Sequence, residues 1–237
     1  MAGHSKWANI KHKKAKEDAK RGKEFTKLIK EITIAARSGG DITGNPRLRT
    51  LVDKAKKINM PSDNITRAIK KGTGELPGVS YEHVTYEGHG PGGSAILVEV
   101  LTDNKNRAVA DMRHIFSKYG GNLGETGAVN WMFEKLGVIR TKSPDMSEEE
   151  LFEQLIEQDL QDLSIHDGVL TITTPMQSLN EVTEAVKNLN IDIDHSELEW
   201  IAKNPMAVAP EHEEKAFLLL EKLEDNDDVQ NVYTNLA

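Results

Sequence analysis

The positive charges of this chain are concentrated in its first third, and this division constrains what each part can fold into. Residues 1–75 hold 19 Lys and Arg against 8 Asp and Glu, a net charge of +11. The remaining residues hold 11 against 30, a net charge of −19, and the two parts sum to −8. This asymmetry predicts a basic module attached to an acidic body.

Composition excludes several classes of protein. The chain has no cysteine, which excludes disulfides, thiol catalysis and thiolate metal sites. No apolar run approaches the ~20 residues that a membrane-spanning helix needs. The basic N-terminus is followed by Glu17 and Asp18 rather than by an apolar stretch, which argues against a targeting peptide. We therefore expect a soluble, cytoplasmic protein, long enough at 237 residues for two or three domains.

Residues 1–75 are predicted to form a basic helical domain. The stretch 11–23 (KHKKAKEDAKRGK) has too few apolar side chains to bury a face, so it is either a flexible arm or a helix ordered by a partner. Apolar residues then recur at helical spacing in 25–36, 46–58 and 62–71, which predicts a three-helix bundle in which Asn45 caps the second helix. We expect the lysines and arginines of this bundle, including Lys27, Lys30 and Arg37, on its solvent side.

After a turn-rich linker at 73–80, strands alternate with helices. Residues 128–203 have the order β-α-β-β-α-β of a ferredoxin-like unit. Alternation of Val129, Trp131 and Phe133 predicts its first strand, Ser147 and Glu150 a capping box, and His166-Asp167-Gly168 a hairpin turn. A helix at 211–223 and a strand at 229–233 have no complete local sheet, and we expect them to join the β-β-α segment at 81–119. The predicted fold is multidomain α and α+β: a three-helix bundle (1–75) followed by two ferredoxin-like α+β domains, one (128–205) inserted in the other (76–127 plus 206–237). A linear arrangement of three domains is the alternative.

Motifs for catalysis or cofactor binding are weak. Residues 88–93 (GHGPGG) match a dinucleotide-binding glycine pattern, but a strand and not a helix follows, so a tight connection between strands is favoured. None of the eight histidines forms a metal-binding pair by spacing, and His114 is interpreted as a packed or rim residue. No pair of carboxylates is singled out for acid–base work. We expect no enzyme activity, no catalytic residue, no metal and no cofactor.

The remaining signal is the cluster of cations near the N-terminus. Within residues 6–30 lysine outnumbers arginine by nine to one, which favours contact with phosphates over recognition of bases. Trp7 is expected either to stack on a base or, preferably, to fill the helical core. Helices 46–58 and 62–71 resemble a helix-turn-helix variant, in which Asn64, Thr66, Arg67 and Lys70 could reach base edges. The predicted nucleic-acid-binding residues are Lys6, Lys11, Lys13, Lys14, Lys16, Lys20, Arg21, Lys23, Lys27, Arg47, Arg49, Arg67 and Lys70.

Several motifs in order resemble the YebC family over the whole chain, and residues 140–200 are the least distinctive part. These motifs are Gly3-His4-Ser5-Lys6-Trp7, Asp18-Ala19-Lys20-Arg21-Gly22-Lys23 with Phe25-Thr26-Lys27, Asn45-Pro46-Arg47-Leu48-Arg49, Tyr86-Glu87-Gly88 with Gly90-Pro91-Gly92-Gly93, Asp103-Asn104-Lys105-Asn106-Arg107, Gly120-Gly121-Asn122-Leu123-Gly124 and Asp227-Asp228-Val229-Gln230-Asn231-Val232-Tyr233. The resemblance implies a bacterial protein with a helical N-terminal domain and two α+β domains, one inserted in the other. It does not imply catalysis or a cofactor, and it gives no chemical role to the glycine loop.

Family members are described as DNA-binding transcriptional regulators, and others, including mitochondrial relatives, as activators of translation at the ribosome. We therefore expect a regulator of gene expression that binds nucleic-acid backbone through its basic N-terminal domain. Its target is DNA or, in the alternative, structured RNA or the ribosome, as a translation factor. The acidic domains are expected to discourage non-specific wrapping and could contact a protein partner. An enzyme that uses those domains would need a pocket that the sequence does not indicate.

Overall fold

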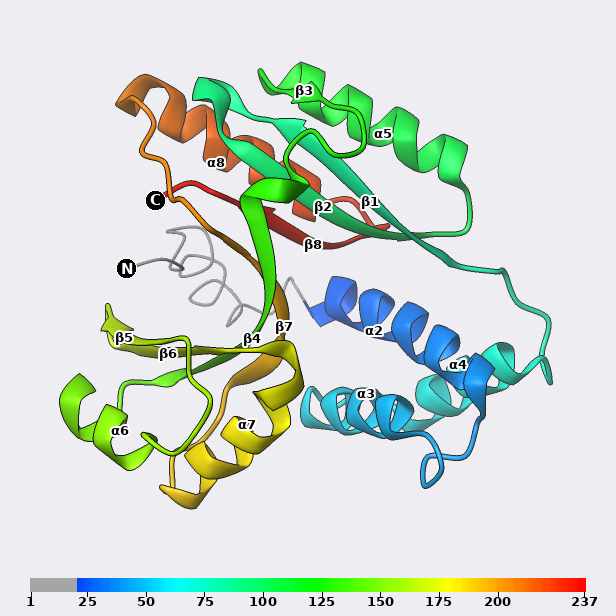
Figure 1. The fold of residues 1–237 in the computed structure, drawn as a ribbon. Coiled ribbons are helices and arrows are strands. Elements are labelled where there is room, and N and C mark those ends of the chain that lie inside the picture. Colours follow the sequence, from blue (N-terminus) through cyan, green and yellow to red (C-terminus); the bar gives the residue numbers. More distant parts are fainter. Residues whose placement is uncertain (1–20) are drawn as a thin grey trace. The chain divides into compact units, whose positions relative to one another are not determined.

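The computed structural model describes residues 21–237, which divide into two compact units (Figure 1). The larger unit consists of residues 21–128 and Val208–Val232, and the smaller unit of Val129–Ala207 and Tyr233–Ala237. Both α-helices and β-strands are present, and the strands form two four-stranded sheets.

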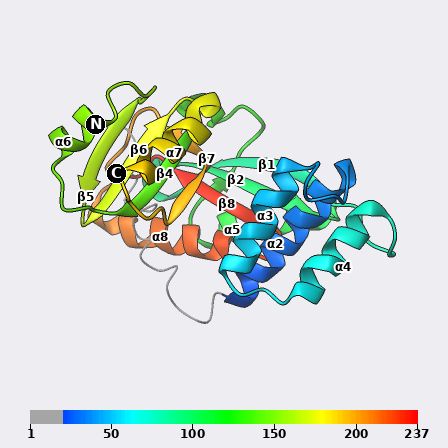
Figure 2. The same ribbon diagram turned by 90° about the horizontal axis from the view of Figure 1, so that it is seen from below.

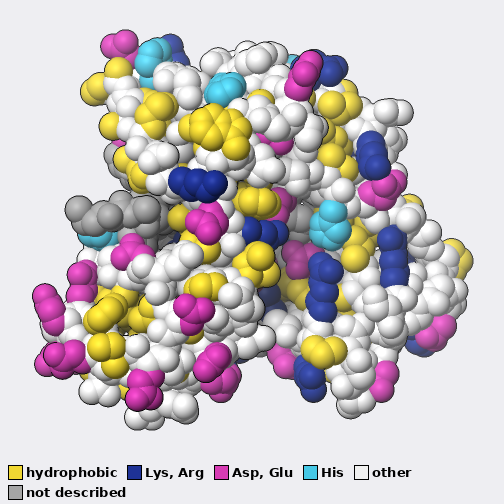
Figure 3. All heavy atoms as spheres, in the orientation of Figure 1, with side chains coloured by type: hydrophobic (Ala, Val, Ile, Leu, Met, Phe, Trp, Pro, Cys, Tyr) yellow, Lys and Arg dark blue, Asp and Glu magenta, His cyan; other side chains and the backbone are white. Residues whose placement is uncertain are grey.

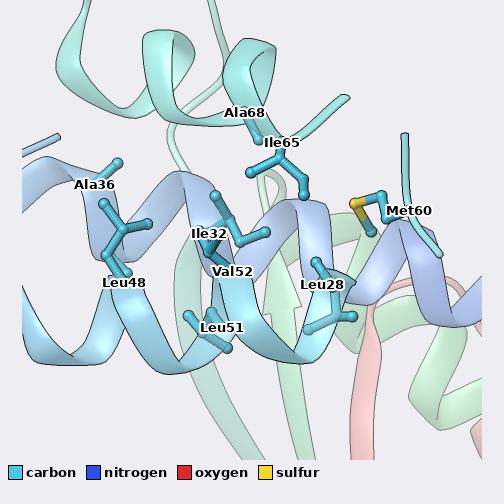
Figure 4. Close-up of a cluster of buried hydrophobic side chains, with 11 residues drawn as sticks. Leu28, Ile32, Ala36, Leu48, Leu51, Val52, Met60, Ile65 and Ala68 are labelled. Atoms are coloured by element: carbon cyan, nitrogen blue, oxygen red, sulfur yellow. The ribbon is translucent and has the colours of Figure 1, made fainter. Parts of the chain in front are cut away.

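The larger unit begins with three helices that share one apolar core. They are α2 (Arg21–Ala35), α3 (Pro46–Lys57) and α4 (Ser62–Thr73). Helix α2 lies between the other two (Figure 2) and buries Leu28 and Ile32 against Leu48 and Val52 of α3 and Ile65 of α4 (Figure 4). The Asn45 side chain caps α3 by accepting from the Leu48 N–H, and Gly74 ends α4 with positive φ. The periodicity of the sequence thus predicted all three helices.

The sheet of the larger unit is covered on one side by two helices. Strands β1 (Glu82–His89), β2 (Ala95–Thr102), β3 (Asn122–Leu123) and β8 (Val229–Thr234) lie in the order β3-β1-β2-β8, and β1 is antiparallel to β2 and β3. Helices α5 (Lys105–Lys118) and α8 (Pro210–Glu224) pack on the same side of the sheet (Figure 1). Phe116 and Leu219 are fully buried there. Strand β2 is buried along almost its whole length, which explains its continuous apolar run.

The smaller unit has the chain order β-α-β-β-α-β. Its elements are β4 (Phe133–Lys142), α6 (Glu148–Gln154), β5 (Asp162–His166), β6 (Val169–Thr174), α7 (Leu179–Asn188) and β7 (His195–Ala202). The strands lie in the order β5-β6-β4-β7, and each adjacent pair is antiparallel. Leu151 of α6 and Val182 of α7 pack with Ile139 and Ile172 on one side of this sheet. Asp167 and Gly168, both with positive φ, close the β5–β6 hairpin that the sequence predicted.

One predicted strand was wrong at its beginning. The alternation of Val129, Trp131 and Phe133 predicted an extended segment, but residues Asn130–Met132 form a 3-10 turn and β4 begins only at Phe133. The Met132 N–H donates to the Val129 carbonyl, so Val129 is buried while Trp131 is 67% exposed. The predicted domain boundaries, and the assignment of both sheets to ferredoxin-like domains, stay predictions. Within residues 21–237 no helix has the length and apolarity needed to cross a bilayer.

Candidate nucleic-acid interface

Helices α3 and α4 carry most of the exposed cations of the helical bundle. Residues 46–73 hold eight Lys and Arg against two Asp, a net charge of +6. Their apolar residues face α2, so the charged ones are left on the outside. Six cations are exposed and have no carboxylate within 4 Å among residues 21–237: Arg47, Arg49 and Lys57 of α3, and Arg67, Lys70 and Lys71 of α4. We call these six residues the α3–α4 cation surface.

The cations of α4 lie together because of helical geometry. Arg67, Lys70 and Lys71 stand at i, i+3 and i+4, which places them on one exposed face. Ile65 and Ala68 occupy the opposite, buried face. An exposed face with three unpaired positive charges suits a polyanion, because phosphate contacts need charge and reach rather than a shaped pocket.

The cations of α2 have a different role. They contact the segment around β8 within the larger unit. The hydrogen bonds run from Lys23 Nζ to Asp225 Oδ1 (2.6 Å), from Lys27 Nζ to the Gln230 carbonyl (3.1 Å) and from Lys30 Nζ to Asp228 Oδ1 (2.7 Å). Arg37, in the 3-10 turn that follows α2, donates to the Ser80 hydroxyl of the linker and to the Tyr81 carbonyl, both at 3.1 Å. Helix α2 therefore uses its positive charges to attach the bundle to the sheet.

Lys30 corrects the expectation that the bundle's cations face solvent. Its side chain is buried, with 7% of the residue exposed. Besides Asp228, its ammonium group donates to the carbonyls of Leu101 (3.3 Å) and Asp227 (2.7 Å), and it lies 5.7 Å from the centre of the Tyr81 ring. A lysine can be buried in this way because its three donors all have acceptors and its charge has a partner.

Asp228 is the centre of a cluster of contacts between α2 and the sheet. We call this cluster, formed by Lys30, Thr102, Asp103, Arg107 and Asp228, the junction. Its second oxygen, Oδ2, accepts from Arg107 Nη2 at 2.8 Å and from the Thr102 hydroxyl at 2.9 Å. Arg107 is held in turn by Asp103, at 2.7 Å. Burial raises the pKa of Asp228, but the hydrogen bonds from Arg107, Lys30 and Thr102 outweigh it, so the pKa lies below its usual range.

The lowered pKa predicts how this junction responds to acid. Because the folded pKa of Asp228 lies below its unfolded value of about 3.9, its contribution to stability is complete above that pH. The contribution is lost as the pH falls through the folded pKa, when the carboxylate is protonated beside Lys30. We expect the protection of α2 amides against hydrogen exchange, taken relative to the intrinsic exchange rate at each pH, to fall over this range in the native protein. In Asp228→Asn this part of the acid response should be absent, and an identical response in both proteins would contradict the assignment.

No local pattern in the sequence predicts this junction. Asp103 to Arg107 and Asp227 to Asp228 belong to the motifs of the family resemblance, but no role accompanied them. Nothing local in the sequence shows that Lys30 and Asp228, 198 positions apart, will pair. The family resemblance was the one signal that pointed to these residues, because the motifs at 103–107 and 227–233 both place charged residues at the ends of predicted helices or strands.

The glycine loop at 88–93 joins β1 to β2, as its sequence context favoured over a dinucleotide site. Gly92 and Gly93 have positive φ, and the Gly90 N–H donates to the Ser94 carbonyl at 2.7 Å. A Cβ on Gly88 would lie 2.6 Å from the Phe116 ring. These glycines are thus required by close packing and turn geometry. Within residues 21–237, no three His, Asp or Glu side chains come together as metal ligands.

The predicted binding residues thus fall into three groups. Lys6, Lys11, Lys13, Lys14, Lys16 and Lys20 lie outside the described residues, as does Trp7, and the structure describes only the backbone of Arg21. Lys23 and Lys27 bond within the larger unit. Arg47, Arg49, Arg67 and Lys70 are exposed on α3 and α4, and Lys57 and Lys71, absent from the prediction, extend the same surface. A role for any of them in binding nucleic acid stays a prediction.

Comparison with known proteins identifies the family. Residues 5–75 match the model for the TACO1/YebC protein N-terminal domain, and residues 81–236 match that for the TACO1/YebC second and third domain. The chain belongs to the TACO1/YebC family. This confirms the resemblance stated from the sequence motifs.

TACO1/YebC relatives match over nearly their whole length. A protein of Desulfosudis oleivorans is 52% identical over 100% of this chain and 97% of its own, and one of Geobacter sulfurreducens is 51% identical over 99% and 95%. Both are named "Probable transcriptional regulatory protein". The crystal structure of a conserved hypothetical protein from Aquifex aeolicus is 45% identical, with a TM-score of 0.85 over 94% of this chain and 93% of that one. At family level this chain is thus grouped with transcriptional regulators.

Proposed function

We propose that this protein is a non-catalytic regulator of gene expression that binds the phosphate backbone of nucleic acid through its basic N-terminal domain. The observation that carries the proposal is the α3–α4 cation surface, where six cations are exposed and unpaired within the described part of the chain. The names of the relatives support a regulator, and DNA is therefore the first target to test. The part of the basic stretch that precedes α2 in the sequence, residues 11–20, adds five lysines to this domain.

Structured RNA, including the ribosome, is the second candidate target. Lysines dominate the basic N-terminal stretch, and few exposed side chains of α4 are suited to base edges. Such a surface recognises the charge and shape of a backbone, which RNA duplexes also provide. Selection of a preferred promoter sequence would favour DNA, and co-sedimentation with ribosomal particles would favour RNA.

The proposal predicts a steep dependence of binding on salt. If the protein neutralises about six phosphates, its affinity for a 30-base-pair DNA duplex should fall roughly 10³-fold between 50 and 200 mM salt. Fluorescence anisotropy of a labelled duplex, and of an RNA hairpin of equal charge, would measure this. An affinity that stays flat across this range contradicts backbone binding.

Charge reversal on α4 tests where the contact lies. Replacing Arg67, Lys70 and Lys71 by Glu should reduce the slope of log affinity against log salt by about three, and should weaken every sequence similarly. The matched control reverses three exposed cations elsewhere in the larger unit, Arg113, Lys118 and Lys215. An equal loss in the control would show that overall charge, and not this surface, determines binding. A loss confined to one DNA sequence would mean that base recognition dominates.

A further inference from the structure

The segment 145–162 of the smaller unit is the most acidic part of the chain. It holds eight Asp and Glu and no Lys or Arg, a charge equal to the net charge of the whole protein. Helix α6 and the turn after it occupy its centre. Over the region where Figure 1 draws α6, Figure 3 shows hydrophobic side chains bordered by acidic ones.

Some of these carboxylates have structural roles and others do not. Glu150 completes a capping box with Ser147, and Glu148 accepts from the Ile165 N–H. Glu149, Glu153 and Glu157 are exposed and have no cation within 4 Å among residues 21–237. Glu149 and Glu153 stand one helical turn apart, so their charges lie on one face of α6. None of these three charges is part of an ion pair among the described residues, and Glu149, in the first turn of α6, also favours the positive end of the helix dipole.

Two large apolar side chains stand beside these free carboxylates. Phe152 is 51% exposed and Ile156, in the turn after α6, is 66% exposed. Their neighbours Leu151 and Leu155 are buried and supply the contact of this segment with the core. The core is therefore complete without Phe152 and Ile156. A phenylalanine and an isoleucine that remain exposed together mark an interaction site more often than an isolated surface residue does.

We propose that Phe152, Ile156, Glu149, Glu153 and Glu157 form a docking surface for a basic amphipathic helix of a partner protein. The apolar pair would receive the apolar face of that helix, and the three carboxylates would meet its flanking lysines or arginines. Nucleic acid and anionic lipid do not fit, because their phosphates would face unpaired carboxylates. A twofold contact with a second copy of this chain does not fit either, because it would place the same carboxylates against one another.

The experiment uses the full-length protein and, as probe, a fluorescent 18-residue amphipathic helix made of lysine and leucine. We expect binding that weakens with salt. The affinity for the probe should fall about tenfold in Phe152→Ser/Ile156→Ser and in Glu149→Gln/Glu153→Gln/Glu157→Gln. Two control variants should bind as the native protein does: Met176→Ser/Leu198→Ser, which removes exposed apolar residues of the same unit, and Glu181→Gln/Glu211→Gln/Glu214→Gln, which removes three other exposed carboxylates.

Two results would overturn the proposal. Equal weakening in the controls would mean that the probe binds acidic surface without preference for α6. Self-association of the native protein that the Phe152→Ser/Ile156→Ser variant abolishes, seen by sedimentation, would make a second copy the occupant. The nucleic-acid affinity of all four variants should be unchanged, so this test fails or succeeds independently of the proposed function. Hydrogen exchange of residues 148–157, slowed by the probe in the native protein, would support the site directly.

Discussion

Replacing Asp228 by Ala should destabilise the larger unit by about 3–5 kcal/mol, the usual cost of breaking a buried ion pair from one side. The side chains of Lys30 and Asp228 are only 8% and 10% exposed, so solvent cannot take the place of the lost carboxylate. Lys30 would keep two carbonyl acceptors but lose its compensating charge. Arg107 would retain Asp103, and therefore Lys30 accounts for most of the cost.

The measurement must report on the larger unit alone. Trp131 and Trp200 lie in the smaller unit, so tryptophan fluorescence would follow the wrong part of the molecule. Hydrogen exchange of α2 peptides is suitable, and we expect it to accelerate strongly in Asp228→Ala. Replacing both partners, in Lys30→Met/Asp228→Leu, should restore most of the protection, because an apolar pair leaves no buried charge. Unchanged exchange of α2 in Asp228→Ala would show that this ion pair does not hold the helix.

An effect of similar size is expected in the smaller unit when Glu199 is replaced by Ala. Arg140 is only 4% exposed and forms a bidentate salt bridge with this carboxylate. Its Nη1 donates to Oε1 at 2.7 Å and its Nη2 to Oε2 at 2.8 Å. His195 Nε2 lies 2.7 Å from Oε1. Burial raises the pKa of Glu199, but the charge of Arg140 and the hydrogen bond with His195 outweigh it, so the pKa lies far below its usual range. Without the carboxylate, Arg140 would be a buried and unpaired cation. We therefore expect the smaller unit to lose about 3–5 kcal/mol of folding stability.

Trp200 provides the signal for this second prediction. The chain has three tryptophans, so Trp7→Phe/Trp131→Phe leaves Trp200 alone, next to Glu199 on β7. In that background, Glu199→Ala should lower the urea midpoint of the fluorescence transition, and Glu134→Gln, an exposed residue of β4, should leave it unchanged. Equal midpoints for Glu199→Ala and its parent would contradict the prediction. Exchange of α2 should be unaffected, because that helix belongs to the larger unit.

What sequence reasoning could predict depended on how local each feature is. The apolar face of α3, the Asn45 cap, the Ser147–Glu150 capping box and the turn at Asp167 are all set by residues within about four positions, and all are present in the structure. The predicted strand at Val129–Phe133 was wrong at its beginning because an alternation of apolar residues over five positions fits both a strand and a turn that leads into a strand.

The candidate site was less predictable because charge alone does not tell which way a helix will face. Lys30 and Arg67 look alike in the sequence, yet one is buried beside Asp228 and the other is exposed. The difference arises from which elements pack against α2 and α4, a long-range property. The same holds for Arg140 and Glu199, which meet only through the register of β4 against β7.

The distance along the chain between Lys30 and Asp228 has a consequence for biosynthesis. A growing polypeptide presents its helical bundle early, but Asp228, in the turn before β8, is translated only after strands β4 to β7. Nascent α2 therefore spends most of elongation with a lysine whose partner does not yet exist. Domains generally fold in the order in which they leave the ribosome, whereas here the attachment of the first segment must wait for one of the last.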